Sequence, residues 1–104
     1  MRTLMKVSIP VESGNRTVKD GTLQRVIGDA VTRLRPEASY FFPQNGLRSC
    51  LMVFDLKNVS DIPGIVEPFF VELNAAADFI PVMNAEDLRK GLGTFVDEHA
   101  AVRR

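Results

Sequence analysis

The sequence predicts an α+β fold in which amphipathic helices cover one face of an antiparallel sheet. Its 104 residues suit a single domain, spanning positions 1–104. Apolar residues alternate with a period of two in some segments and recur at three- and four-residue spacings in others, as strands and helices do. An Asn45-Gly46 pair between two apolar runs is typical of a tight β-hairpin.

The first segment predicts a strand followed by a helix. Residues 3–11 alternate as in a half-buried strand, and residues 13–15 have the composition of a loop. A helix then extends from an Asp20 N-cap to the stop signal at Pro36. Its apolar stripe consists of Leu23, Val26, Ile27, Ala30, Val31 and Leu34.

The middle of the chain predicts a hairpin and a second helix. Residues 38–43 and 48–56 are rich in β-formers and flank the Asn-Gly turn. Ser60 is expected to cap the second helix. Because a proline inside a helix removes a backbone donor, Pro68 predicts a kink or a break.

Residues 76–83 predict a fourth strand, and Asn84 with Asp87 opens a short last helix expected to end at Gly91 or Gly93. The order is therefore βαββαβ followed by a helix. Right-handed crossovers convert that order into a four-stranded antiparallel sheet with two helices on one face, the ferredoxin-like arrangement.

Both faces of the predicted sheet are apolar, which indicates self-association. The hairpin register places Phe41, Cys50, Met52 and Phe54 on one face. The opposite set is Tyr40, Phe42, Leu51 and Val53. The short last helix could cover part of the second face, but a second copy of the chain, packed sheet against sheet, covers it better. We therefore expect a homodimer or a higher oligomer of dimers.

Composition argues against several classes of partner. Lysine plus arginine equals aspartate plus glutamate at 13 each, so no basic excess suggests nucleic-acid binding. No apolar run is long enough for a membrane span or signal peptide, and a cytoplasmic protein is expected. Cys50, the sole cysteine, is expected to fill the core, and one histidine with one cysteine makes a metal site improbable.

The order of elements also resembles a known family. Residues 5–11, the Met-Val-Phe-Asp run at 52–55, the helix from Ser60 to a Pro-Phe-Phe segment, and the strand at 77–83 resemble the muconolactone-isomerase-like group. That group belongs to the dimeric α+β barrel superfamily, whose ferredoxin-like chains pair their sheets. The resemblance implies either a cofactor-free isomerase or a cofactor-free monooxygenase. It assigns no catalytic residue to this chain.

Three residues are candidates for acid–base chemistry. His99 has a suitable unperturbed pKa, although a solvated surface position is the simpler interpretation. Tyr40 could orient a carbonyl or phenol, or it could be a core residue. Glu67, beside Pro68, could be held in an apolar setting, or it could be an exposed helix residue.

The expected function is small-molecule binding without a cofactor, the ligand being small and apolar or aromatic. The alternative is a non-catalytic binding or assembly module that acts through its homodimer. The residues expected to line a ligand pocket are Tyr40, Phe42, Arg48, Phe54, Phe70 and Asp78.

Overall fold

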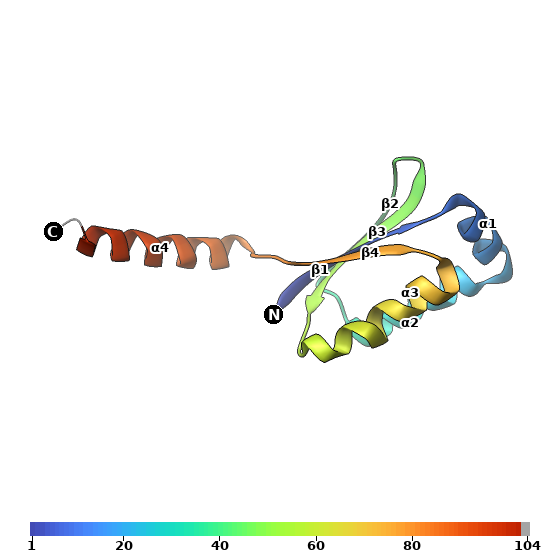
Figure 1. Cartoon of the computed structure of the whole chain (residues 1–104), viewed down its shortest axis with the longest axis horizontal. Coiled ribbons are helices and arrows are strands. Elements are labelled where there is room, and N and C mark those ends of the chain that lie inside the picture. Colours follow the sequence, from blue (N-terminus) through green and yellow to red (C-terminus); the bar gives the residue numbers. More distant parts are fainter. Residues whose placement is uncertain (103–104) are drawn as a thin grey trace.

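The computed structural model describes residues 1–102 and has an α+β architecture (Figure 1). Its antiparallel sheet has the strand order β2-β3-β1-β4. The strands are β1 (Arg2–Ile9), β2 (Ala38–Gln44), β3 (Leu47–Asp55) and β4 (Ala76–Pro81). The helices are α1 (Val11–Asp20), α2 (Thr22–Leu34), α3 (Ile62–Leu73) and α4 (Ala85–Val102), with the 3₁₀ turn η1 (Val59–Asp61) before α3. The expected antiparallel sheet of four strands is confirmed.

The core lies between one face of the sheet and the helices α2 and α3, which run side by side along that face in Figure 1. On β1, side chains from Met5 to Ile9 alternate between buried and half-buried positions, as strand geometry requires. Met5 pairs with Met52 and Val7 pairs with Cys50, so the buried sets of β1 and β3 share a face. Phe69 and Leu73 of α3 close this core from the other side.

The hairpin turn is the one that the sequence predicts. Asn45 and Gly46 have φ values of 55° and 75°, the positive values that a type I′ turn needs. Gln44 pairs with Leu47 directly across the turn. The face assignment that follows from this register, with Cys50 and Leu51 on opposite faces, is confirmed.

Residues 11–20 form helix α1, so the prediction of a strand end and a loop there is wrong. The side that α1 buries consists of Ser13, Gly14 and Thr17. Their small size lets the helix pack closely, and their hydroxyl groups find acceptors: Thr17 Oγ1 donates to the carbonyl of Ser13 at 2.7 Å, and Ser13 Oγ donates to the carbonyl of Leu73 in α3 at 2.7 Å. Because this buried stripe contains no apolar residue, hydrophobic periodicity cannot reveal it.

Two expected caps differ in the structure. Asp20 is the last residue of α1, and Gly21, with φ 85°, occupies the N-cap of α2. The carboxylate of Asp20 still accepts a hydrogen bond from the Thr22 backbone at 2.9 Å. Ser60 does not cap α3, because the 3₁₀ turn around it places Asp61 at the N-cap.

Helix α3 continues through Pro68, so the expected break is wrong. Proline has no N–H to donate to the carbonyl four residues earlier, which belongs to Gly64. Arg33 Nη1 of α2 donates to that carbonyl instead, at 2.9 Å. A side chain from the neighbouring helix thus replaces the hydrogen bond that the proline removes.

Helix α4 does not end at Gly91 or Gly93, and it is long rather than short, with 18 residues. Its start matches the prediction: the Asp87 N–H donates to Asn84 Oδ1 at 2.8 Å, and the Asn84 N–H donates to Asp87 Oδ2 at 3.1 Å. Figure 1 shows α4 projecting beyond the sheet, opposite to α1. It therefore covers no part of the sheet face that turns away from α2 and α3. Among residues 1–102, none of the helices combines the length and the apolar character that a membrane span requires.

Candidate functional sites

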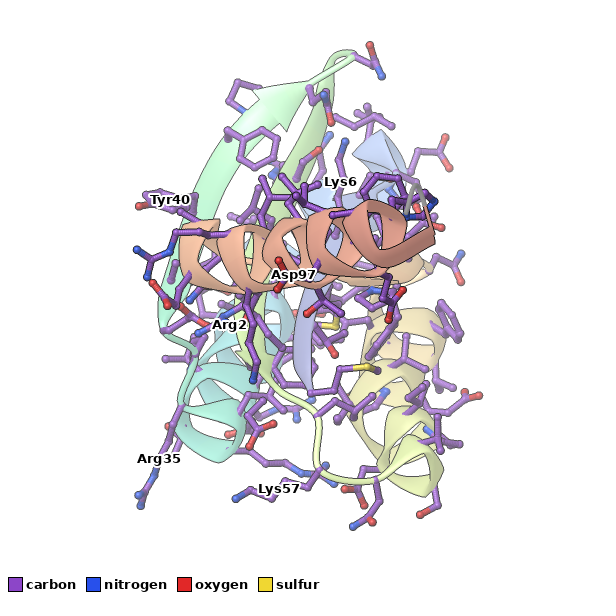
Figure 2. The ribbon with its side chains drawn as sticks, turned by 90° about the vertical axis from the view of Figure 1, so that its left-hand side faces the viewer. Arg2, Lys6, Arg35, Tyr40, Lys57 and Asp97 are labelled. Carbon is purple, nitrogen blue, oxygen red and sulfur yellow. The ribbon has the colours of Figure 1, made fainter. Side chains whose placement is uncertain are left out.

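The face of the sheet that turns away from α2 and α3, here called the open face, carries rows of side chains that cross all four strands. One row is apolar throughout: Ala38, Val53, Leu4 and Ile80. The next row changes from apolar to charged: Tyr40, Leu51, Lys6 and Asp78. Figure 2 shows Tyr40 at the edge of the sheet and Lys6 nearer its middle. Tyr40 is 64% exposed and Ile80 is 47% exposed, whereas Ala38, Val53 and Leu4 are half-buried, so the chain covers this apolar surface only in part.

An ionic cluster joins the start of β1 to the first turn of α4. Arg2 Nε lies 2.5 Å from Glu37 Oε1, and Arg2 Nη1 lies 2.9 Å from Asp87 Oδ2. The Val82 N–H also donates to the Arg2 carbonyl at 3.1 Å. These contacts fix the point at which α4 leaves the sheet.

An apolar cleft of about 340 Å³ lies between α2 and the β2–β3 hairpin. It exists because β2 is an edge strand: α2 leaves Phe41 of β2 54% exposed. The residues that line it are Ile9, Leu23, Ile27, Phe41, Phe42, Pro43, Arg48, Ser49 and Cys50.

Arg48 is the one charged residue in this lining. It pairs with Ile9 across β1 and β3, which places it on the helix side of the sheet. Its guanidinium also lies against α1, since a Cβ atom at Gly14 would fall 2.7 Å from Arg48 Nη1. Within residues 1–102 the guanidinium makes no ion pair and no side-chain hydrogen bond.

Cys50 forms part of the cleft wall and is only 2% exposed. Burial raises the pKa of its thiol to about 11. The thiol is therefore neutral at physiological pH and a poor nucleophile. Its expected place in the core is confirmed.

A second hollow, of about 170 Å³, lies between α2 and α3 and is bridged by charged groups. Arg25 is paired with Glu72 across it, and Arg33 donates to Gly64. These contacts hold the two helices together, so we assign this hollow a structural role.

The six expected pocket residues do not gather in one place. Phe42 and Arg48 line the apolar cleft. Tyr40 and Asp78 share the open face, Phe54 is buried in the core, and Phe70 is 38% exposed on α3. The reason is strand geometry: neighbouring positions such as Tyr40 and Phe41 point to opposite faces, so Tyr40 lies on the open face while Phe41 lines the cleft.

The three candidate catalytic residues lie on three separate elements. Tyr40 is on β2 and Glu67 is an exposed residue of α3. His99 lies on the projecting α4, with its Nδ1 atom 2.9 Å from the Phe95 carbonyl and its ring against the Phe95 ring. No hydrogen bond joins any two of the three in the described part of the chain. They form no catalytic set within one chain.

Sequence reasoning missed the apolar part of the cleft. Leu23 and Ile27 fit the apolar stripe of a core helix, and nothing local distinguishes a helix residue that faces a cleft from one that faces the core. The pairing of Pro43 with Arg48 across the hairpin was the available signal, because it places Arg48 on the same face as Phe41 and Cys50.

Comparison with known proteins adds no assignment, since no protein-family model and no curated protein matches this sequence. No cluster of three potential metal ligands occurs among the described residues.

Proposed function

We propose that this protein is a homodimer that binds a small apolar molecule. The observation that carries the proposal is the apolar row on the open face, formed by Ala38, Val53, Leu4 and Ile80, of which Ile80 is exposed and the other three are half-buried. Leaving large apolar side chains in water costs roughly 1.5–3 kcal/mol each relative to burial. A second copy of the chain, packed open face to open face, removes this cost.

The strand order supports such pairing. The order β2-β3-β1-β4, with α2 and α3 on one face, is that of a ferredoxin-like arrangement. Two such sheets packed through their free faces form an α+β barrel, the architecture that the resemblance to the muconolactone-isomerase-like group implies. Each subunit then keeps its own apolar cleft, most of whose lining residues lie on the helix side of the sheet.

The proposal includes ligand binding but no reaction. The cleft is concave and apolar with one charged group, as small-molecule sites commonly are. Tyr40, Glu67 and His99 do not converge on it. Isomerase or monooxygenase activity would require groups that pairing of two subunits brings together.

The oligomeric state tests the dimer. In size-exclusion chromatography with light scattering, we expect the full chain to have twice its chain mass of 11.6 kDa. V53D places a charge in the middle of the apolar row and should yield a folded monomer. V59D adds the same charge at a position that is 74% exposed in η1 and should remain dimeric. A wild-type monomer, or a V53D dimer, would refute sheet pairing.

A second candidate function is assembly through α4. Leu88, Leu92 and Phe95 are 46%, 54% and 53% exposed, and together with His99 they follow a 4-3-4 spacing. That spacing is the seam of a short coiled coil. A second copy of α4 is the partner that fits this seam, which favours a role in joining dimers.

A further inference from the structure

We propose that the apolar cleft binds an amphipathic carboxylate, with the carboxylate on Arg48 and the hydrocarbon part between α2 and the hairpin. This inference rests on the proposed ligand-binding function and specifies its ligand. It is carried by three features: the walls of the cleft, the free guanidinium at its edge, and the glycine that makes room for that guanidinium.

The walls set the apolar part of the ligand. Leu23 and Ile27 of α2 face Phe41 of β2, and Ile9 and Cys50 complete the surface between them. The Cys50 thiol is neutral, so it adds no charge to this surface. About 340 Å³ is enough for a short alkyl chain or a single aromatic ring.

Arg48 sets the polar end of the ligand. Four other arginines have partners in the chain: Arg2, Arg25, Arg33 and Arg89. Arg48 is exposed and, like Arg16 and Arg35, has no partner within the described residues, but among these three it alone lines the apolar cleft. A guanidinium binds a carboxylate through two parallel hydrogen bonds, and an adjoining apolar surface strengthens that pair by excluding water.

Gly14 provides the space that Arg48 occupies. A Cβ atom at this position would lie 2.7 Å from Arg48 Nη1 and 3.3 Å from Arg48 Cδ. Glycine is unfavourable inside a helix, yet α1 has it at the point where the guanidinium packs. The missing Cβ atom leaves the space in which the Arg48 guanidinium lies.

The charge of the site favours a carboxylate over a phosphate. One guanidinium, with no second cation in the lining, balances one negative charge. A phosphate dianion would leave charge unpaired beside Leu23 and Phe41, at a high desolvation cost. The site therefore fits a monoanion with an apolar body.

The test compares octanoate with 1-octanol and octylammonium, which share one chain length and differ in charge. Each is titrated into the full-length ¹⁵N-labelled protein, and amide shifts are followed at Leu23, Ile27 and Cys50. We expect octanoate to bind about tenfold more tightly than octanol, the effect of one charge-assisted hydrogen bond. Octylammonium should bind most weakly.

Variants then identify the charged group. R48Q should weaken octanoate binding about tenfold and leave octanol binding unchanged. R35Q is the matched control, because Arg35 follows the far end of α2 and lies at the opposite end of the molecule from the hairpin tip in Figure 2. G14A retains every charge but displaces Arg48, so it should also weaken octanoate binding while the helical circular dichroism is retained.

The outcomes separate this inference from the proposed function. Equal binding of octanoate and octanol in the cleft would overturn the carboxylate assignment and leave ligand binding standing. Shifts of the same size in wild type and R48Q would also overturn it. If neither octanoate nor octanol shifts the cleft amides, the ligand-binding function fails together with the inference, while the dimer is judged by its mass alone.

Discussion

At the scale of single residues, small buried polar side chains hold two helices together, as apolar contacts do elsewhere in the core. Ser13 is buried on α1, and its Oγ donates to the Leu73 carbonyl at 2.7 Å across 60 residues of sequence. Leu73 is the last residue of α3, so its carbonyl has no partner within its own helix. The hydroxyl of Ser13 thus fastens α1 to the end of α3.

S13A should lower the free energy of unfolding by about 1–2 kcal/mol, because it removes the hydrogen bond and leaves a buried carbonyl unpaired. Urea denaturation at fixed protein concentration measures the change. S60A is the control: Ser60 is exposed in η1 and makes no cap, so its loss should cost less than about 0.5 kcal/mol. Equal effects of the two variants would contradict the role of Ser13.

Burial of Cys50 makes the free energy of unfolding depend on pH in the alkaline range. The unfolded chain loses the thiol proton at the ordinary pKa of 9.0, whereas the folded chain keeps it until about 11. Between these values unfolding releases a proton, so stability falls as the pH rises. C50A should therefore lose less stability than wild type between pH 8 and 10.5 in thermal denaturation. Parallel curves would show that the thiol does not titrate differently in the two states.

At the scale of elements, α2 and α3 depend on each other where Pro68 interrupts the helical hydrogen bonds. Arg33 supplies the donor that Gly64 lacks, and Gly64 leaves room for it: a Cβ atom there would lie 3.0 Å from Arg33 Nη2. The continuity of α3 is therefore a property of the helix pair. Sequence reasoning about α3 alone predicts a kink or a break, because the compensating donor lies 31 residues earlier.

A double-mutant cycle tests this dependence. R33A should cost about 0.5–1 kcal/mol in the wild-type background, because it removes the Gly64 hydrogen bond. In the P68A background it should cost close to nothing, since the restored backbone N–H satisfies the same carbonyl. Chemical denaturation of the four proteins gives the coupling energy. If R33A costs the same in both backgrounds, Arg33 does not replace the missing donor.

At the scale of the whole molecule, the open face of the sheet and the α4 seam formed by Leu88, Leu92 and Phe95 have no partner among residues 1–102. They point to different contacts because α4 leaves the sheet and extends the molecule to 66 Å in its longest dimension. Arg2 is ion-paired with Asp87 in the first turn of α4, whereas Leu88, Leu92 and Phe95 remain exposed.

L92D combined with F95D should leave the dimer intact and remove any larger species. Aspartate in the α4 seam prevents helix pairing but does not touch the apolar row around Val53. Native mass spectrometry over a range of protein concentrations distinguishes the species. A monomeric double variant would make α4 the dimer contact and displace the open face from that role.

Local sequence pattern was enough to predict the strands and the hairpin. Alternation in residues 3–11 and β-forming residues around the turn predicted strands whose ends agree with the structure to within two residues. The Asn45-Gly46 turn predicted the register, which places Cys50 and Leu51 on opposite faces of the sheet. These features follow from periodicity and backbone preferences, which depend only on residues close together in the sequence.

Other features of the fold depend on residues far apart in the sequence and become evident only in the folded chain. Helix α1 buries Ser13 and Thr17, whose polarity hides the helix from any apolar pattern. Pro68 stays helical because of Arg33. The cleft brings Arg48 to Leu23 and Ile27, which local periodicity assigns to the core. In each case a contact across the fold outweighs the local preference, because its energy is gained only when the segments meet.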